Sequence, residues 1–221
     1  MPQHILIIGA NRGIGLELTK RYLERGELVT AACRKASPEL LNLNCDILEG
    51  IDVTCDDSVN AMVTQLSSTK IDVLIHNSGI LRSDSYPDIS IDRMREHFEV
   101  NSLGPLRTIM ALEHLLDNGS KVGIVSSRVG SIDDNTSSNN YAYRTSKTAV
   151  NMIGKCLSID LKPKGVAVAL LHPGYVRTDM TRHNGLIEAD EAAIGLITRM
   201  DELTLDQTGC FVHANGEVLT W

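Results

Sequence analysis

Short apolar runs alternate along the chain with segments whose apolar residues recur at helical spacing. Residues 4–8 (HILII) form an apolar run that ends at glycine, which predicts a short strand buried on both faces. Residues 13–25 place apolar side chains at the three- and four-residue intervals of a helix, and Gly26 follows as a C-terminal cap signal. The chain is therefore expected to begin with a strand, a tight turn and a helix.

The alternation continues to the end of the chain. Short strands that are apolar on both faces and separated by helices are typical of a parallel sheet covered by helices on both faces. Right-handed connections then give a doubly wound α/β fold of about seven strands, the Rossmann type. The weak point is Gly104-Pro105, because proline disrupts a helix interior. Further strands are expected at 28–33, near 50–53, and at 71–75, 121–125, 166–171 and 209–213, and helices within 37–53 and at 54–66, 91–117, 140–161 and near 189–200.

Composition narrows the class of protein. The 221 residues contain no repeat or linker, so one domain spanning 1–221 is expected. With 43% apolar and 22% charged residues, the chain is expected to be neither disordered nor fibrous. A net charge of −7 without a basic run disfavours nucleic-acid binding. No apolar run approaches the ~20 residues of a membrane span, and the first residues do not resemble a secretion signal.

The cysteines point to a reducing compartment. They are odd in number and scattered, and neither they nor the histidines have metal-ligand spacing. Reduced thiols in a cytoplasmic protein without a metal site are therefore expected. The five residues are Cys33, Cys45, Cys55, Cys156 and Cys210.

A glycine-rich turn joins the first strand to the first helix. Gly9, Gly13 and Gly15 lie in the sequence GANRGIG, between a predicted strand and the amino terminus of a helix. Glycines let the backbone approach a pyrophosphate, and the free N–H groups of the helix then face that anion. The alternative is a glycine turn without a ligand. The context favours a dinucleotide site.

The residues at the end of the second strand bear on the choice between NAD(H) and NADP(H). NAD-binding units place a carboxylate there to hold the ribose 2′-hydroxyl. Here the strand ends at Cys33-Arg34-Lys35, and Glu27 stands at its opposite end. Arg34 suits a 2′-phosphate through its planar fork, and Arg12 in the turn supplies a second cation. Unless these residues are merely solvated loop charges, they predict NADP(H).

A Ser, Tyr and Lys constellation supplies the candidate chemistry. Tyr143 and Lys147 are four residues apart in a predicted helix, so they share one face. A neighbouring ammonium favours the phenolate and is expected to lower the tyrosine pKa. Ser126 and Ser127 end the fifth strand, at the edge of the sheet where the crevice of such folds lies. Either serine could bind a substrate oxygen, although a Tyr and Lys at this spacing also arise by chance.

These motifs together resemble the short-chain dehydrogenase/reductase superfamily over nearly the whole chain. The resemblance implies a catalytic tetrad in which Asn101 joins Ser127, Tyr143 and Lys147, with Ser127 preferred to Ser126 because Gly130 follows at the family spacing. Asn101 would anchor a water that links Lys147 to solvent, and Lys147 would also hold the nicotinamide ribose. The cofactor residues that follow from the motifs and the resemblance are Gly9, Asn11, Arg12, Gly13, Ile14, Gly15, Arg34, Asp52, Val53, Asn77, Ser78, Gly79, Tyr143, Lys147, Pro173, Gly174, Val176 and Thr178.

Several segments are similar to one branch of this superfamily, the C-factor proteins and the sniffer-type carbonyl reductases. They are VSSRVGS, YAYRTSK, LHPGYVRTDM and GCFVHANGEVLTW. The branch implies NADPH-dependent reduction of an aldehyde, ketone or quinone, with a small-molecule carbonyl or alcohol as partner. The alternative is a C-factor-like NADP(H)-binding signalling or sensor protein whose catalysis is incidental. Ile8, His76 and Ser78 depart from the family pattern, but none bears on the chemical step.

The two longest predicted helices suggest self-association. Related proteins pair such helices across a two-fold axis, which implies a homodimer, possibly a tetramer. The alternative is that their apolar residues only cover the sheet. The residues in question are Ile109, Leu112, Leu116, Val150 and Ile153.

Overall fold

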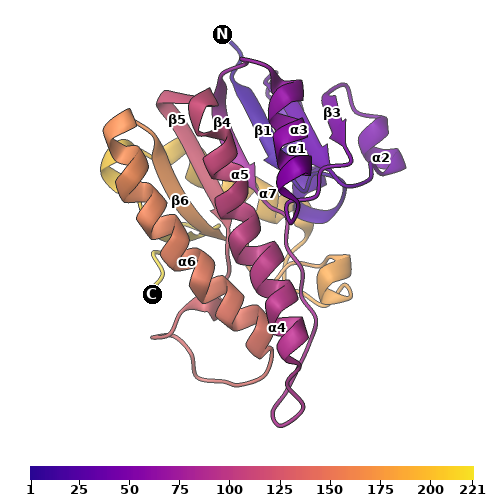
Figure 1. The fold of residues 1–221 in the computed structure, drawn as a ribbon, viewed down its shortest axis with the longest axis vertical. Coiled ribbons are helices and arrows are strands. Elements are labelled where there is room, and N and C mark those ends of the chain that lie inside the picture. The colour runs from indigo at the N-terminus through magenta and orange to yellow at the C-terminus, as the bar shows by residue number, and fades with distance from the viewer.

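The computed structural model describes residues 1–221 and contains one sheet of seven parallel strands. The strands lie in the order β3-β2-β1-β4-β5-β6-β7 (Figure 1). Strands β2 and β3 are added on one side of β1, and β4 to β7 are added on the other side. The predicted doubly wound parallel sheet is confirmed. The strands are β1 (His4–Ile8), β2 (Leu28–Cys33), β3 (Asp46–Glu49), β4 (Ile71–His76), β5 (Leu116–Val125), β6 (Ala167–His172) and β7 (Cys210–His213).

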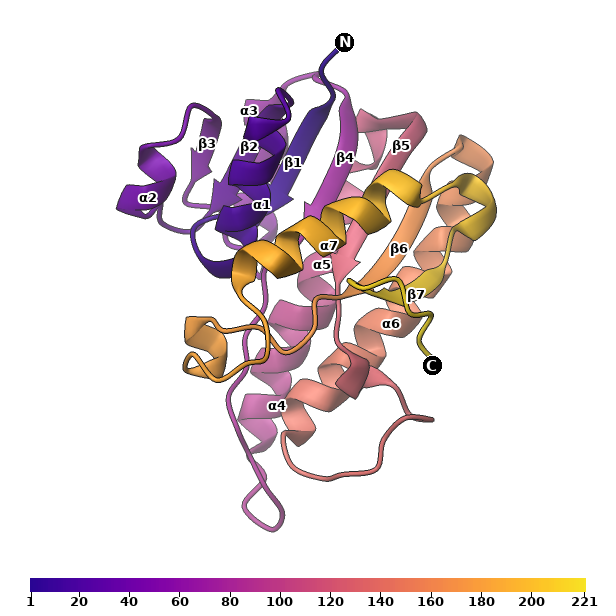
Figure 2. The same ribbon diagram turned by 180° about the vertical axis from the view of Figure 1, so that it is seen from behind.

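Helices cover both faces of this sheet (Figures 1 and 2). Helices α1 (Gly13–Glu24) and α7 (Ala189–Glu202) lie on one face. Helices α3 (Asp56–Leu66), α5 (Gly104–Leu112) and α6 (Tyr141–Leu161) lie on the other. The short α2 (Pro38–Leu41) begins at Ser37, whose hydroxyl accepts from Leu40 N, and α4 (Ile91–Phe98) runs beside α6. None of the helices is long and apolar enough to cross a membrane.

Two apolar cores form because successive side chains of a strand point to opposite faces of the sheet. Ile5 and Ile7 of β1 belong to the core under α1 and α7. Leu6 and Ile8 belong to the core under α3, α5 and α6. Each core contains more than twenty buried residues, so both helix layers are fixed to the sheet and its carboxyl edge is a rigid platform.

Three elements differ from the prediction, one of them β5, which begins at Leu116 rather than at residue 121. The third strand is Asp46–Glu49 rather than 50–53, because Gly50 takes a positive φ of 83° that ends the extended run. The helix predicted over 91–117 is divided into α4, a π-helical turn at Glu99–Leu103 and α5, and a 3₁₀ turn at Glu113–Leu115 then leads into β5. The π turn places Pro105 within the first turn of α5, where its missing N–H is tolerated.

The apolar residues that suggested self-association cover the sheet instead. Ile109, Leu112 and Val150 are buried in the core under α3, α5 and α6, and Ile153 packs against it. Leu116 is not helical but begins β5. The alternative explanation is therefore correct for the four helical residues, because they face the strands, and the homodimer itself stays a prediction.

Candidate active site

The predicted site residues gather at the carboxyl edge of the sheet. The loops after β1, β4, β5 and β6 begin on adjacent strands, so segments far apart in sequence lie side by side there. Helix α6 brings Tyr143 and Lys147 to the same edge from its first turns (Figures 1 and 2). The fold thus joins the glycine turn to the Ser, Tyr and Lys constellation.

Two positions of the glycine turn, Gly9 and Gly15, are packed too closely for a side chain. A Cβ on Gly9, whose φ is +86°, would lie 2.8 Å from the backbone of Ser78, and a Cβ on Gly15 would lie 2.1 Å from the Gly9 carbonyl oxygen. Asn77 Nδ2 also donates to that oxygen over 2.9 Å. The loops after β1 and β4 therefore brace each other through backbone contacts that only glycine permits.

The amino terminus of α1 is open to an anion. Its N-cap residue, Arg12, makes no side-chain capping hydrogen bond, and the first turn contains no acidic residue. The first amides of a helix without a side-chain cap are free to bind an anion, and the helix dipole favours negative charge there. A Cβ on Gly13 would lie 3.3 Å from Thr178 Cγ2, so the segment after β6 faces this turn.

The two predicted phosphate-binding arginines differ in their partners. Arg12 Nη1 donates to Asp179 Oδ2 over 2.9 Å, so this guanidinium already has a carboxylate partner. Arg34 follows β2, is exposed and makes no ion pair. It lies near enough to Asp52 to contribute to the lowered pKa of that carboxyl, whose larger causes are hydrogen bonds from Thr54. Arg34 is therefore free to bind an anion at this corner.

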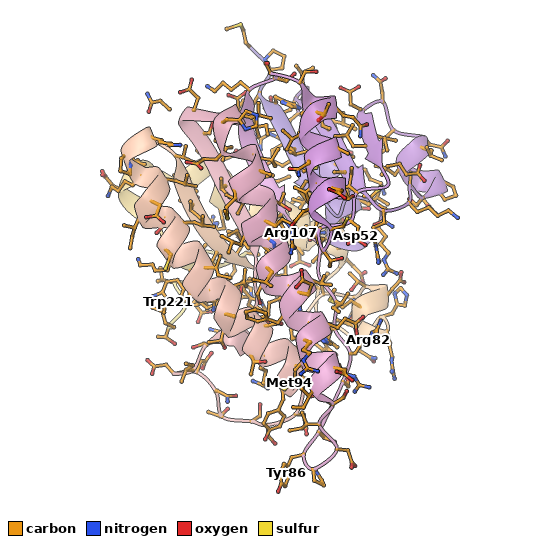
Figure 3. The ribbon with its side chains drawn as sticks, viewed as in Figure 1. Asp52, Arg82, Tyr86, Met94, Arg107 and Trp221 are labelled. Atoms are coloured by element: carbon orange, nitrogen blue, oxygen red, sulfur yellow. The ribbon has the colours of Figure 1, made fainter.

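Asp52 and Val53 lie between β3 and α3, facing α5. Figure 3 shows Asp52 near Arg107, which donates to the Val53 carbonyl oxygen over 2.7 Å. The Val53 side chain is buried against Gly104, where an added Cβ would lie 2.9 Å from Val53 Cγ2. The side chain of Val53 therefore packs inward, and its predicted cofactor contact would have to come from the backbone.

Ser127, Tyr143 and Lys147 form a compact group. Ser127 is buried at the end of β5, and its hydroxyl accepts from Val129 N over 3.4 Å. Lys147 Nζ lies 5.6 Å from the centroid of the Tyr143 ring and donates to the Val125 carbonyl oxygen over 2.9 Å. Ser126 instead donates to Asn151 Oδ1 over 2.5 Å, so Ser127 is the serine left for a substrate.

The pKa values differ from the expected direction. Burial raises the pKa of Tyr143 to about 12, although a hydrogen bond with Ser127 acts to lower it. Burial also lowers the pKa of Lys147 to about 8. The prediction that Lys147 lowers the pKa of Tyr143 is therefore wrong for the protein without bound cofactor. The physical reason is that both groups are taken out of water, which disfavours the phenolate and the ammonium alike.

Asn101 lies in the π-helical turn between α4 and α5. Its Oδ1 accepts from Ile80 N over 2.8 Å, and its Nδ2 donates to Ile80 O and to Ser146 Oγ over 3.0 and 2.9 Å. A Cβ on Gly79 would lie 3.3 Å from Asn101 Oδ1 and 3.8 Å from Lys147 Nζ. Gly79 thus keeps a small space between the amide and the lysine. Turns of this kind recur at functional sites.

The sequence did not reveal two carboxylates at this edge. Asp84 is buried, and its Oδ2 accepts from Ala142 N over 3.2 Å while its main-chain oxygen accepts from Asn140 N over 2.8 Å. It thereby caps the helix that carries Tyr143, since Asn140 makes no side-chain cap. Asp179 is the partner of Arg12. Neither pairing has a local motif, because the partners are 58 and 167 residues apart.

Known protein sequences resemble this chain over most of its length. The family model described as short chain dehydrogenase matches residues 3–187. The 1-hydroxy-2-glutathionyl-2-methyl-3-butene dehydrogenase of Rhodococcus sp. (strain AD45) is 42% identical over 98% of this chain and 99% of its own. The C-signal of Myxococcus xanthus is 36% identical over 74% of this chain and 100% of its own.

Solved structures share the same fold. The carbonyl reductase Sniffer of D. melanogaster superposes with a TM-score of 0.92 at 29% identity, covering 100% of both chains. The NADPH-bound carbonyl reductase from chicken fatty liver superposes with a TM-score of 0.91 at 27% identity, covering 100% of this chain and 99% of its own. The resemblance inferred from the motifs is thereby confirmed.

Proposed function

Because the chain belongs to the short-chain dehydrogenase family, we propose that this oxidoreductase uses NADPH to reduce an aldehyde, ketone or quinone to an alcohol. The observation that carries this proposal is the placement of Ser127, Tyr143 and Lys147 beside an open, glycine-lined helix terminus. Residues 1–221 would form one NADP(H)-binding domain. We place it in the cytoplasm, in keeping with its five free cysteines.

The residues fit NADP(H). The α1 terminus and the glycines of the turn can approach the pyrophosphate, and the unpaired Arg34 can hold the 2′-phosphate. Similar solved structures are bound to NADPH or NADP. The segment after β6 faces the turn and would close the nicotinamide side of the cleft. Its predicted contact residues are Pro173, Gly174, Val176 and Thr178.

The proposed reduction depends on three side chains. When bound, NADPH supplies the hydride that adds to the carbonyl carbon. Ser127 Oγ donates a hydrogen bond to the carbonyl oxygen and stabilises the negative charge that grows there. Tyr143 gives its phenolic proton to that oxygen. A pKa of about 12 keeps the phenol protonated at neutral pH, as reduction requires. Lys147, charged below about pH 8, stabilises the phenolate that remains.

The signalling alternative is not favoured. A relative at 42% identity is named as a dehydrogenase, and the superposed structures are carbonyl reductases. That relative's name describes an alcohol that carries a glutathionyl group, which makes thioether-linked alcohols and their carbonyl products useful members of a substrate panel. Turnover of NADPH with such a panel, and none without a carbonyl compound, is the result that supports the proposal.

Carbonyl reduction should lose efficiency at alkaline pH. The lowered pKa of Lys147 means that its ammonium is present below about pH 8 and is lost above it. We expect kcat/KM to fall about tenfold per pH unit beyond that point, because the departing proton leaves the phenolate without its counter-charge. Deprotonation of Tyr143 cannot cause this fall in kcat/KM, since the pKa of Tyr143 is about 12.

Lys147→Arg is the control for this pH dependence, because a guanidinium stays protonated throughout the range. Its activity will be lower, but the alkaline fall near pH 8 should disappear. If kcat/KM of this variant still falls near pH 8, a group other than Lys147 causes the fall. A flat wild-type profile would contradict the role given to Lys147.

We also propose that the protein forms a homodimer through α5 and α6. Met110, Met152 and Ile159 are 62%, 66% and 63% exposed on these helices, and an open groove of about 500 Å³ lies between α3 and α5 next to Met110. Burying such side chains stabilises a two-fold interface. Sedimentation at micromolar concentration should give about twice the 24.1 kDa of the chain, and Met152→Glu should shift it toward a monomer. A monomer for the wild type would refute this assembly.

A further inference from the structure

The 3₁₀ turn Arg128–Gly130, which follows Ser127 directly, is held by α6 on one side. A Cβ on Gly130 would lie 2.7 Å from the backbone carbon of Lys147, so the turn rests on the helix without an intervening side chain. Thr148 Oγ1 donates to the Gly130 carbonyl oxygen over 2.9 Å. The helix that carries Tyr143 and Lys147 therefore fixes the inner side of this turn.

Trp221 holds the other side of this turn and the residues that follow it through hydrogen bonds. The main-chain oxygen of Trp221 accepts hydrogen bonds from Ser131 Oγ, Ile132 N and Asp133 N over 2.8, 2.6 and 3.2 Å. Residues 132–139 are otherwise exposed, and they lead to Tyr143. Figure 3 shows Trp221 beside α6, on the flank of the molecule near that loop.

Trp221 is itself fixed to the sheet. Its ring stacks on Phe211 of β7 at a centroid distance of 5.4 Å and an interplanar angle of 23°, and Lys155 Nζ lies 5.9 Å from the Trp221 ring. Leu219 N donates to the Phe211 carbonyl oxygen over 2.8 Å. The indole thus anchors the oxygen that holds the loop.

An ion-pair network joins the same two segments. Arg128 pairs with Asp134 over 2.9 Å, and it also pairs with Glu217. These charges are about half exposed, so each pair contributes little stability by itself, but together they fix the direction of the turn. The segment Glu217–Trp221, here called the clasp, therefore contacts residues 128, 131, 132 and 133.

We propose that the clasp positions Ser127 and the following loop against Tyr143 during the reaction. The inference rests on the proposed reductase function, since it assigns to residues 217–221 a positioning role in that chemistry. Ser127 directly precedes the turn that the clasp holds. A small displacement of a group that contacts the substrate can lower the reaction rate strongly. The clasp touches neither the glycine turn nor Arg34, so NADPH binding should not depend on it.

The test compares Trp221→Ala with Trp221→Phe, which keeps a ring on Phe211. We expect Trp221→Ala to lower kcat for carbonyl reduction about tenfold, with the dissociation constant for NADPH within about twofold of the wild type. Trp221→Phe should recover most of that loss. Glu217→Gln should lower kcat by a smaller factor. Asp201→Asn is the control, because it removes an ion pair between Asp201 and Arg25 that lies outside the clasp. This variant should leave kcat unchanged.

Hydrogen exchange supplies a readout that does not require turnover. The amides of Ile132 and Asp133 should exchange at least about tenfold faster in Trp221→Ala than in the wild type, while the amides of β1 stay unchanged. Unchanged exchange at these amides would overturn the clasp. Faster exchange with unchanged kcat would overturn its positioning role. If the wild type reduces no carbonyl compound, the reductase proposal fails, and exchange alone then decides whether the clasp holds the loop.

Discussion

Replacing Tyr143 with phenylalanine should abolish carbonyl reduction while leaving NADPH binding nearly intact. The ring packs in the same place, at 5.6 Å from Lys147 Nζ, and only the hydroxyl is removed. Without it the growing alkoxide receives no proton from the protein, and Ser127 remains as the single hydroxyl donor. We expect kcat to fall by about 10³-fold or more, because an acid catalyst usually contributes about 10²–10⁴-fold and the hydroxyl also orients the substrate.

Tyr141 provides a matched control. It lies two residues earlier in the first turn of α6 and is also half-buried. Tyr141→Phe should keep at least half of wild-type activity, and both variants should titrate NADPH with the wild-type dissociation constant. A Tyr143→Phe enzyme that retains a tenth of wild-type turnover would show that another group donates the proton.

Replacing Arg34 with aspartate should reverse the cofactor preference. A charge-assisted hydrogen bond contributes about 1.5–3 kcal/mol, and about 1.4 kcal/mol corresponds to a factor of ten in affinity. Arg34 alone should therefore favour NADPH over NADH by about tenfold or more. A second contact of this size from Arg12 would require its pair with Asp179 to open. Arg34→Asp removes the attraction and repels the 2′-phosphate, so NADH should become the preferred cofactor.

Lys35→Asp tests whether position or net charge decides this preference. Lys35 adjoins Arg34, is also exposed, and its replacement changes the total charge by the same amount. We expect it to retain the NADPH preference within a few-fold, with the effect of Arg34→Asp concentrated in KM rather than kcat. Added salt should weaken wild-type binding of NADPH more than that of NADH. If the wild type binds both cofactors with equal affinity at low salt, Arg34 does not contact the 2′-phosphate.

Local sequence signals predicted the features that depend on neighbouring residues. The glycine turn and its helix are consecutive, and the four-residue spacing of Tyr143 and Lys147 places them on one helical face, so both features are seen in the structure. The alternation of apolar strands and helices was enough to predict the parallel sheet, which is confirmed. The roles of the individual site residues stay predictions.

Features set by distant contacts could not be predicted. The partner of Arg12 comes from the loop after β6, and the cap of α6 comes from Asp84 in the loop after β4. The π turn at Glu99–Leu103 depends on how α4 and the turn itself pack against α6. The pKa of Tyr143 depends on burial, which outweighs its hydrogen bond with Ser127. Each of these follows from tertiary packing rather than from local spacing.

Hydride transfer from NADPH that carries deuterium at both C4 positions of the nicotinamide ring tests the proposed activity most directly. The wild type and Tyr143→Phe are incubated with the labelled cofactor and a panel of aldehydes and ketones, and the alcohols are analysed by mass spectrometry. The account predicts an alcohol with one deuterium on its carbinol carbon from the wild type, and none above background from Tyr143→Phe. A wild-type protein that binds NADPH but labels no alcohol, or a variant that labels it at the wild-type rate, would contradict the account.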